Sequence, residues 1–172
     1  MTPFHDRFVE LYEMHFTRVR RFLDRLSGDP ALAADIAQDA FVRLYRRGSS
    51  PDEPAAWLIT VALNLLRNSK STAARRRRLL SPARAEATLA DTGRGPDELA
   101  ESADLRRRVR AALERMPERD RQLLLLRSEG YRYRELAAAL SLNPASVGVL
   151  LTRAKRAFRA AYEGAEVATD AS

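Results

Sequence analysis

The stretch that decides the fold is Asp35-Ile-Ala-Gln-Asp-Ala-Phe-Val-Arg-Leu-Tyr45, because it reads as a helix with two different faces. At about 100° per residue its apolar side chains gather on one side and can pack against a core; they are Ile36, Ala37, Ala40, Phe41 and Leu44. The other side carries Asp35, Gln38 and Asp39, with Val42 among them. An acidic face with one apolar spot suits docking onto a basic partner. The plainer alternative is an amphipathic core helix with one stray valine, since single exposed apolar residues are common.

The composition is that of a folded protein. The 172 residues allow one domain or two small ones, and the chain is 45% apolar and 31% charged. It has no cysteine, and two histidines ten residues apart do not form a metal site. No apolar run is long enough to cross a bilayer, and the N-terminus lacks the pattern of a signal peptide. We therefore expect a cytoplasmic protein without membrane insertion, bound metal or cofactor.

The basic charge is concentrated in blocks. The formal net charge is +7, and seven basic residues with no acid lie between Arg67 and Arg84. Six acids follow between Glu86 and Asp104. A local basic stripe is typical of a surface that binds nucleic acid, although a run of arginines after a helix is also often a solvated tail.

Helical periodicity dominates the chain, and no stretch alternates long enough to predict a strand. Asp29 is expected to cap a helix that Pro30 begins. The expected helices cover residues 5–26, 30–47, 54–72, 98–115, 118–128, 133–140 and 144–162. The fold class is therefore all-α, with two small helical domains at residues 1–79 and 99–163. A flexible linker at 80–98 joins them, and a disordered tail follows at 164–172.

Residues 133–162 read as a helix-turn-helix. Leu136, Ala137 and Leu140 form the packing face of the first helix, while Asn143 caps the second helix and Pro144 begins it. The side chains left for DNA on the second helix are Ser146, Thr152, Arg153, Lys155, Arg156 and Arg159. In such a motif the early positions meet base edges and the later basic residues meet phosphates. A generic helical hairpin with a basic outer face is the alternative.

Two asparagines one turn apart, Asn64 and Asn68, are further candidates, because amides hydrogen-bond bases and phosphates. Asn64 interrupts an apolar run, which costs stability unless its side chain has a partner.

Four segments together resemble a bacterial RNA polymerase sigma factor of the extracytoplasmic function (ECF) group of the sigma-70 family. They are 35–45, Pro54-Ala-Ala-Trp-Leu-Ile-Thr-Val-Ala-Leu-Asn64, Leu113-Glu-Arg-Met-Pro-Glu-Arg-Asp-Arg121 and Tyr133-Arg-Glu-Leu-Ala-Ala-Ala-Leu140. With the helix 146–158 they follow in the family's order over nearly the whole chain. The resemblance implies a protein that is not an enzyme and that binds core RNA polymerase, promoter DNA and an anti-sigma factor.

The resemblance also implies roles for individual residues. The set that docks onto the clamp helices of the largest polymerase subunit is Asp35, Gln38, Asp39, Val42 and Arg43. The set that binds and melts the −10 element is Asn64, Arg67, Asn68, Lys70, Arg75, Arg76, Arg77 and Arg78, with Asn64 in the pocket for a flipped base. The set that reads the −35 element is Arg134, Asn143, Ala145, Ser146, Gly148, Thr152, Arg153, Lys155 and Arg156.

The sequence departs from the family pattern at three places. Ala34 stands where members usually have an acid, and no aromatic lies between Arg46 and Ala56 to shape the base pocket. Gly148 and Leu150 stand where many members have a basic residue, so reading of the −35 element is expected to use backbone, shape and phosphate contacts.

The sequence therefore predicts a promoter-specificity subunit that binds core polymerase, bridges two promoter elements and melts the −10 DNA. A stand-alone helix-turn-helix regulator, whose N-terminal helices only dimerise it, is the main alternative. A small RNA-binding or RNA-modifying enzyme is a more distant one.

Overall fold

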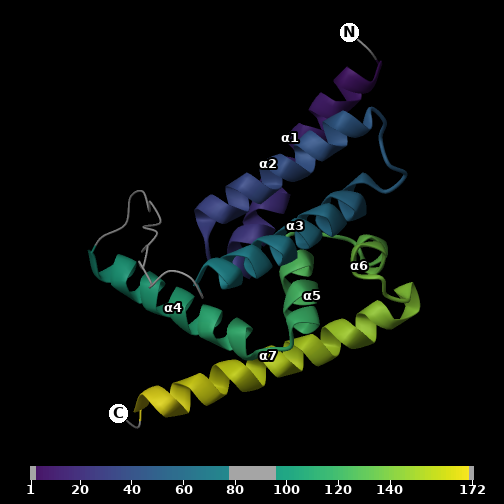
Figure 1. The fold of residues 1–172 in the computed structure, drawn as a ribbon. Helices are drawn as coiled ribbons and strands as arrows, with labels where there is room; N and C mark the ends of the chain where they lie inside the picture. The colour runs from purple at the N-terminus through teal and green to yellow at the C-terminus, as the bar shows by residue number, and fades with distance from the viewer. Residues whose placement is uncertain (1–2, 78–95, 171–172) are drawn as a thin grey trace.

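Seven α-helices and one 3-10 turn make up the residues that the computed structural model describes, 3–77 and 96–170, and these residues contain no strand (Figure 1). The N-terminal half consists of α1 (Pro3–Ser27), α2 (Pro30–Arg47) and α3 (Pro54–Arg77). The C-terminal half consists of α4 (Pro96–Arg115), α5 (Glu118–Ser128), α6 (Tyr133–Leu140), the 3-10 turn η1 (Pro144–Ser146) and α7 (Val147–Asp170). The all-α fold class expected from periodicity is confirmed.

Local signals set the ends of α2, as the sequence predicts. Asp29 precedes the helix in an extended conformation, and its side chain accepts a hydrogen bond from the Leu32 N–H at 3.0 Å. Pro30 occupies the first turn, where its missing N–H costs nothing. At the other end Gly48 adopts a left-handed φ of 71°, and its N–H donates to the Tyr45 carbonyl at 3.1 Å.

Four helices extend beyond their expected bounds, although α1 does so by only two residues at its start and one at its end. Helix α3 ends at Arg77 instead of near 72, so Arg75, Arg76 and Arg77 form its last turn, while Arg78 lies outside the described residues. Helix α4 begins at Pro96, so residues 96–98 of the expected linker belong to a helix. The other residues of the expected linker, 80–95, lie outside the described residues. Proline at a helix start followed by acids that favour the helix N-terminus explains this start.

Helix α7 continues through Gly164 to Asp170, so residues 164–170 of the expected disordered tail are helical, while residues 171–172 lie outside the described residues. A glycine inside a helix costs about 1 kcal/mol relative to alanine. The alanines and glutamates on both sides of Gly164 are strong helix formers, so one glycine does not end the helix.

The two halves pack onto each other and share one apolar core. Buried residues of both halves belong to a single cluster, for example Phe22 and Leu58 with Leu126 and Leu136. Helix α6 packs against α3, and α5 packs against α1 and α7 (Figure 1). A layout of two domains on a linker did not predict this contact between them.

Candidate nucleic-acid and protein interfaces

The outer face of α2 carries the five residues expected to dock onto polymerase. Asp35, Gln38, Asp39, Val42 and Arg43 are all exposed, while the apolar stripe on the inner side, from Ile36 to Leu44, is buried. Val42 is 38% exposed. Among the described residues neither Asp35 nor Asp39 has an ion-pair partner, so their charges face solvent. The structure therefore brings these five side chains together on one accessible surface.

An aromatic cluster between α1 and α2 supports this face, and the sequence did not single it out. Tyr12 stacks on Phe16 with ring centroids 4.6 Å apart, and its ring meets that of Phe41 edge-on at 5.1 Å. Phe8 meets Tyr45 edge-on at 5.1 Å. Tyr12 and Tyr45 remain 40% and 53% exposed. Tyr45 lies three residues after Val42, so the two side chains lie on the same side of α2. This spacing in the sequence could have indicated Tyr45 as part of the docking face.

The residues expected to bind the −10 element lie on α3. Asn64, Arg67, Asn68 and Lys70 are exposed, and the Asn64 Oδ1 accepts a hydrogen bond from the Arg67 Nη1 at 3.1 Å. Asn64 interrupts the apolar run at an exposed position, so its side chain is not buried without a partner. Arg75–Arg77 continue the same helix, so the basic run extends from the asparagines along α3.

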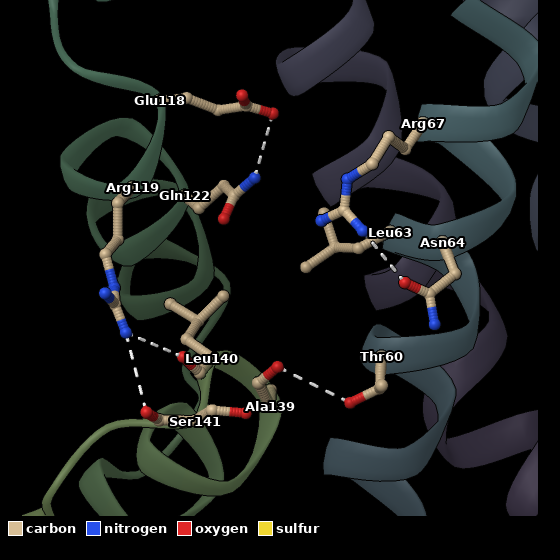
Figure 2. Close-up of a pocket in the computed structure, with 10 residues that line it drawn as sticks. All are labelled: Thr60, Leu63, Asn64, Arg67, Glu118, Arg119, Gln122, Ala139, Leu140 and Ser141. Carbon is tan, nitrogen blue, oxygen red and sulfur yellow. Dashed lines mark hydrogen bonds between the residues drawn. The ribbon is translucent and has the colours of Figure 1, made fainter. Parts of the chain in front are cut away.

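Asn64 and Arg67 also line a pocket that lies between the two halves (Figure 2). The pocket has a volume of about 450 Å³. Its wall on α3 also includes Thr60 and Leu63, and its other walls are formed by Glu118, Arg119, Gln122, Ala139, Leu140 and Ser141. The Thr60 hydroxyl donates to the Ala139 carbonyl at 3.4 Å across this gap. The candidate base-binding side of α3 is thus turned toward the C-terminal half.

Helices α6 and α7 form the expected helix-turn-helix. They meet at 118°, within the range that this motif uses. The Leu142 N–H donates to the Ala137 carbonyl at 2.8 Å, and the Asn143 Oδ1 accepts from the Ala145 N–H at 3.0 Å. Asn143 therefore caps the second helix, whose first turn is the 3-10 turn η1.

No single helix among the described residues is long and apolar enough to cross a membrane.

The residues expected to read the −35 element differ in their availability. Asn143, Ala145, Thr152, Lys155 and Arg156 are exposed, and Ser146 and Gly148 are partly covered. A side chain at Gly148 would meet the Tyr133 ring at an ordinary contact distance of 3.6 Å. Leu150 is half-buried and packs against the core, so it is not available to DNA in place of the usual basic residue.

Two arginines of this set already have acidic partners. Arg153 bonds to the Asp120 carboxylate at 2.9 Å, and that carboxylate is 5% exposed. Arg134 forms an ion pair with Glu53 of the N-terminal half. Arg153 therefore also satisfies a buried charge, whereas Lys155 and Arg156 remain in solvent.

Val149 is a candidate that the sequence analysis missed. It is 74% exposed on α7, the highest fraction among the exposed large apolar side chains of the described residues. It lies on the same helical side as Ala145 and Thr152, at spacings of four and three residues. In the sequence, Val149 is an apolar residue that lies outside the buried stripe of α7, and this position could have identified it.

A buried polar group joins α1 to the connection between α5 and α6. The Glu129 side chain is 2% exposed and lies 2.8 Å from the Arg25 Nη1 and 3.3 Å from the Arg21 Nε. The Arg18 Nε donates to the Glu129 carbonyl at 3.1 Å, and its guanidinium lies 4.1 Å from the centre of the Tyr131 ring. We call Arg18, Arg21 and Arg25 around Glu129 the arginine clasp.

Burial perturbs two groups beside the clasp. Burial, assisted by the positive charge of Arg18, lowers the pKa of His15 below its usual value. Burial also raises the pKa of Tyr131 far above its usual range. The His15 Nδ1 and the Tyr131 hydroxyl are buried and have no hydrogen-bond partner among the described residues.

Comparison with known proteins matches both halves. The protein-family model of Sigma-70 region 2 matches residues 11–78, and the family model of Sigma-70, region 4 matches residues 106–158. "RNA polymerase sigma factor CarQ" of Myxococcus xanthus is 30% identical over 159 residues, which are 89% of this chain and 86% of that protein. "ECF RNA polymerase sigma factor SigE" of Mycolicibacterium smegmatis is 28% identical over 153 residues, which are 87% of this chain and 59% of that protein.

A solved structure has the same fold. The sigma factor RpoE of Bartonella quintana, in complex with the anti-sigma factor NepR, matches with a TM-score of 0.66 at 18% identity. The match covers 91% of this chain and 97% of that one. Since both region models match in order and a relative matches along nearly its whole length, this chain belongs to the sigma-70 family, in the extracytoplasmic function group of RNA polymerase sigma factors that direct transcription initiation.

Proposed function

We propose that three exposed surfaces of this chain divide the work of promoter recognition: α2 binds core RNA polymerase, α3 binds the −10 element, and α6–α7 bind the −35 element. The observation that carries this assignment is the solvent-facing side of α2, where acids and Val42 stand over an otherwise buried helix. The −10 and −35 surfaces follow it in the chain, in the order of the two matched regions.

On α2, Asp35 and Asp39 supply charge for a basic surface, and Val42 with the adjoining Tyr45 ring supplies apolar contact. The proposed partner surface is the pair of clamp helices of the largest subunit. Gln38 and Arg43 complete the face with polar contacts at its rim.

On α3, Asn64 hydrogen-bonds a flipped base of the −10 strand, and Arg67 orients the amide that it already contacts. Asn68, Lys70 and the arginines of the last turn contact phosphates of the opened strand. Melting then draws its free energy from base capture and phosphate contacts, without any chemical step in this chain.

On the helix-turn-helix, Lys155 and Arg156 contact phosphates, while Ala145, Thr152 and Val149 face the major groove. Small and apolar side chains at these positions suit contact with thymine methyl groups. The side chains of Ser146 and Asn143 lie at the start of the reading helix, where base edges are nearest.

The polymerase performs all catalysis in this proposal, and the chain acts in the cytoplasm with it. Its relative RpoE is held by an anti-sigma factor, and we infer that a partner of this class also controls this chain. A regulator that works without polymerase is disfavoured, because the family match spans both halves.

The docking surface is tested by replacing Asp39→Ala and Val42→Ala together. We expect binding to core polymerase to weaken at least about tenfold, because both a desolvated charge and an apolar contact are removed. Fluorescence anisotropy of the labelled chain titrated with core enzyme measures this. The matched control is Leu105→Ala with Glu114→Ala, an exposed apolar residue and an exposed acid on α4. If both double variants bind core like the unmodified chain, α2 is not the docking surface.

A further inference from the structure

Asp120 lies in the first turn of α5 and is buried next to α7, the helix proposed to read the −35 element. Helix α5 packs against α7 within the C-terminal half (Figure 1). The Asp120 side chain is 5% exposed, and its Oδ1 accepts a hydrogen bond from the Arg153 Nη2 at 2.9 Å. Apolar residues of similar volume often stabilise a protein as well as a buried ion pair does. Packing of α5 on α7 alone therefore does not account for a carboxylate at this position.

The bond to Asp120 uses only one end of the Arg153 guanidinium. Arginine carries five N–H donors in a planar fork, and this bond occupies one of them. The Arg153 side chain is 62% exposed, although its acidic partner is buried. Asp120 therefore lies behind the guanidinium, and the other N–H donors of Arg153 remain accessible from solvent.

Arg153 projects from the exposed side of α7. It follows Val149 by four residues and precedes Arg156 by three, so the three side chains share one side of the helix. The proposed function gives this side to the −35 duplex, with Val149 facing the groove and Arg156 contacting phosphate. Arg153 lies between them and is therefore placed to contact the same duplex.

Arg153 differs from the other basic residues of this surface because an acid holds it in place. Among the described residues, Lys155 and Arg156 are exposed and have no acidic partner. A long side chain loses rotamer freedom when it binds, and one that is fixed beforehand loses less. The arginine fork binds a phosphate through two parallel hydrogen bonds, which requires the correct orientation of its plane. The bond to Asp120 supplies this orientation, although it neutralises part of the positive charge.

We propose that Asp120 is a positioning residue for DNA binding: it holds the Arg153 guanidinium in one orientation on α7, and the other N–H donors of Arg153 bind one phosphate of the −35 duplex. This role of Asp120 rests on the proposed function of α6–α7. Asp120 itself does not touch DNA. An oriented phosphate contact fixes the register of α7 on the duplex without reading a base. Such a contact has added weight in this chain, because Gly148 and Leu150 stand where long basic side chains are usual.

The test uses the holoenzyme, formed from core polymerase and the full chain, and a promoter fragment from which it initiates. Each phosphate of the −35 duplex is replaced in turn by a neutral methylphosphonate. The fold-increase in the dissociation constant is called the binding loss at that phosphate. The phosphate that Arg153 binds is the one whose binding loss disappears in Arg153→Gln, and Lys155→Gln and Arg156→Gln identify their phosphates in the same way.

We expect a binding loss of about tenfold at the Arg153 phosphate, since a charge-assisted hydrogen bond is removed. In Asp120→Ala this loss should fall to about threefold or less, because the guanidinium is no longer oriented before it binds. Asp120→Asn keeps an oxygen that accepts the bond from Arg153, so it should retain the full binding loss. The binding losses at the Lys155 and Arg156 phosphates should stay unchanged in both variants. A purely structural loosening of α7 would lower all three together.

The matched control is Asp104→Ala, which removes an acid that pairs with Arg107 at 2.6 Å on α4, outside the −35 surface. It should leave the binding loss at every phosphate unchanged. Circular dichroism measures the helix content of each variant. If Asp120→Ala loses helix content, Asp120→Leu, which fills the same buried space, replaces it under the same criteria.

Four results overturn the proposal: no binding loss depends on Arg153, Asp120→Ala keeps the full loss at the Arg153 phosphate, Asp120→Asn loses it as Asp120→Ala does, or the losses at all three phosphates fall together. If the holoenzyme initiates and no binding loss depends on Arg153, Lys155 or Arg156, the proposed −35 role of α6–α7 is refuted. Binding losses that depend on Lys155 and Arg156 but not on Arg153 refute only the role of Asp120.

Discussion

At the scale of single residues, partners decide which charges are available for binding. In the sequence, the basic residues of the helix-turn-helix are equivalent members of one stripe. In the structure, Arg153 neutralises the buried Asp120 and Arg134 pairs with Glu53, while Lys155 and Arg156 remain in solvent. The sequence could not separate these two groups, because Asp120 lies 33 residues before Arg153 and meets it only after folding.

Val149 yields a prediction at this scale. Its side chain projects from the reading helix, and we expect it to contact a thymine methyl group of the −35 element. Val149→Ala removes about two carbon atoms of apolar contact, and at about 0.8 kcal/mol per buried methylene the preference for that thymine over cytosine should fall about fourfold or more. Initiation from promoters randomised over the −35 element measures the preference.

The control for Val149 is Leu105→Ala, which removes another exposed apolar side chain, from α4. It should leave the base preference at every −35 position unchanged. A Val149→Ala chain with the same −35 preferences as the unmodified chain would show that this side chain does not read DNA.

At the scale of helices, the sequence correctly predicted the helix N-termini that carry a side-chain cap. It did not predict where the helices without a stop signal end. Asp29 and Asn143 cap their helices as expected, because a capping side chain and a following proline act within four residues. The ends of α3 and α7 lie farther along than expected, since arginine, alanine and glutamate all extend a helix and no residue there stops it. The fold class needed only this local information.

Asn143 carries the prediction for a helix. Asn143→Ala removes the hydrogen bond to the Ala145 N–H, and we expect the free energy of unfolding to fall by about 1 kcal/mol. Urea unfolding followed by circular dichroism measures it. Asn68→Ala is the control, since Asn68 lies exposed inside α3, where alanine is the better helix former. Equal midpoints for Asn143→Ala and the unmodified chain would contradict the capping role.

At the scale of the whole molecule, the contact between halves was beyond the reach of sequence patterns. Glu129 is one of 23 acids, and nothing adjacent to it distinguishes a buried, clasped carboxylate from a solvated one. Helical periodicity predicted the outer faces of these helices, whereas their roles as binding sites came from the resemblance to sigma factors and stay predictions. The structure adds that Asn64, although exposed, lines a pocket whose other walls come from the other half, which periodicity along one helix cannot indicate.

The central claim is that this chain gives core RNA polymerase promoter specificity. The most direct measurement is in vitro transcription from a genomic fragment library by core enzyme with and without the chain, with sequencing of the RNA 5′ ends. We expect the chain to concentrate the 5′ ends downstream of one shared pair of −35 and −10 elements, and Asn64→Ala to deplete these starts. If the distribution of 5′ ends is the same with the chain as with core enzyme alone, the account is contradicted.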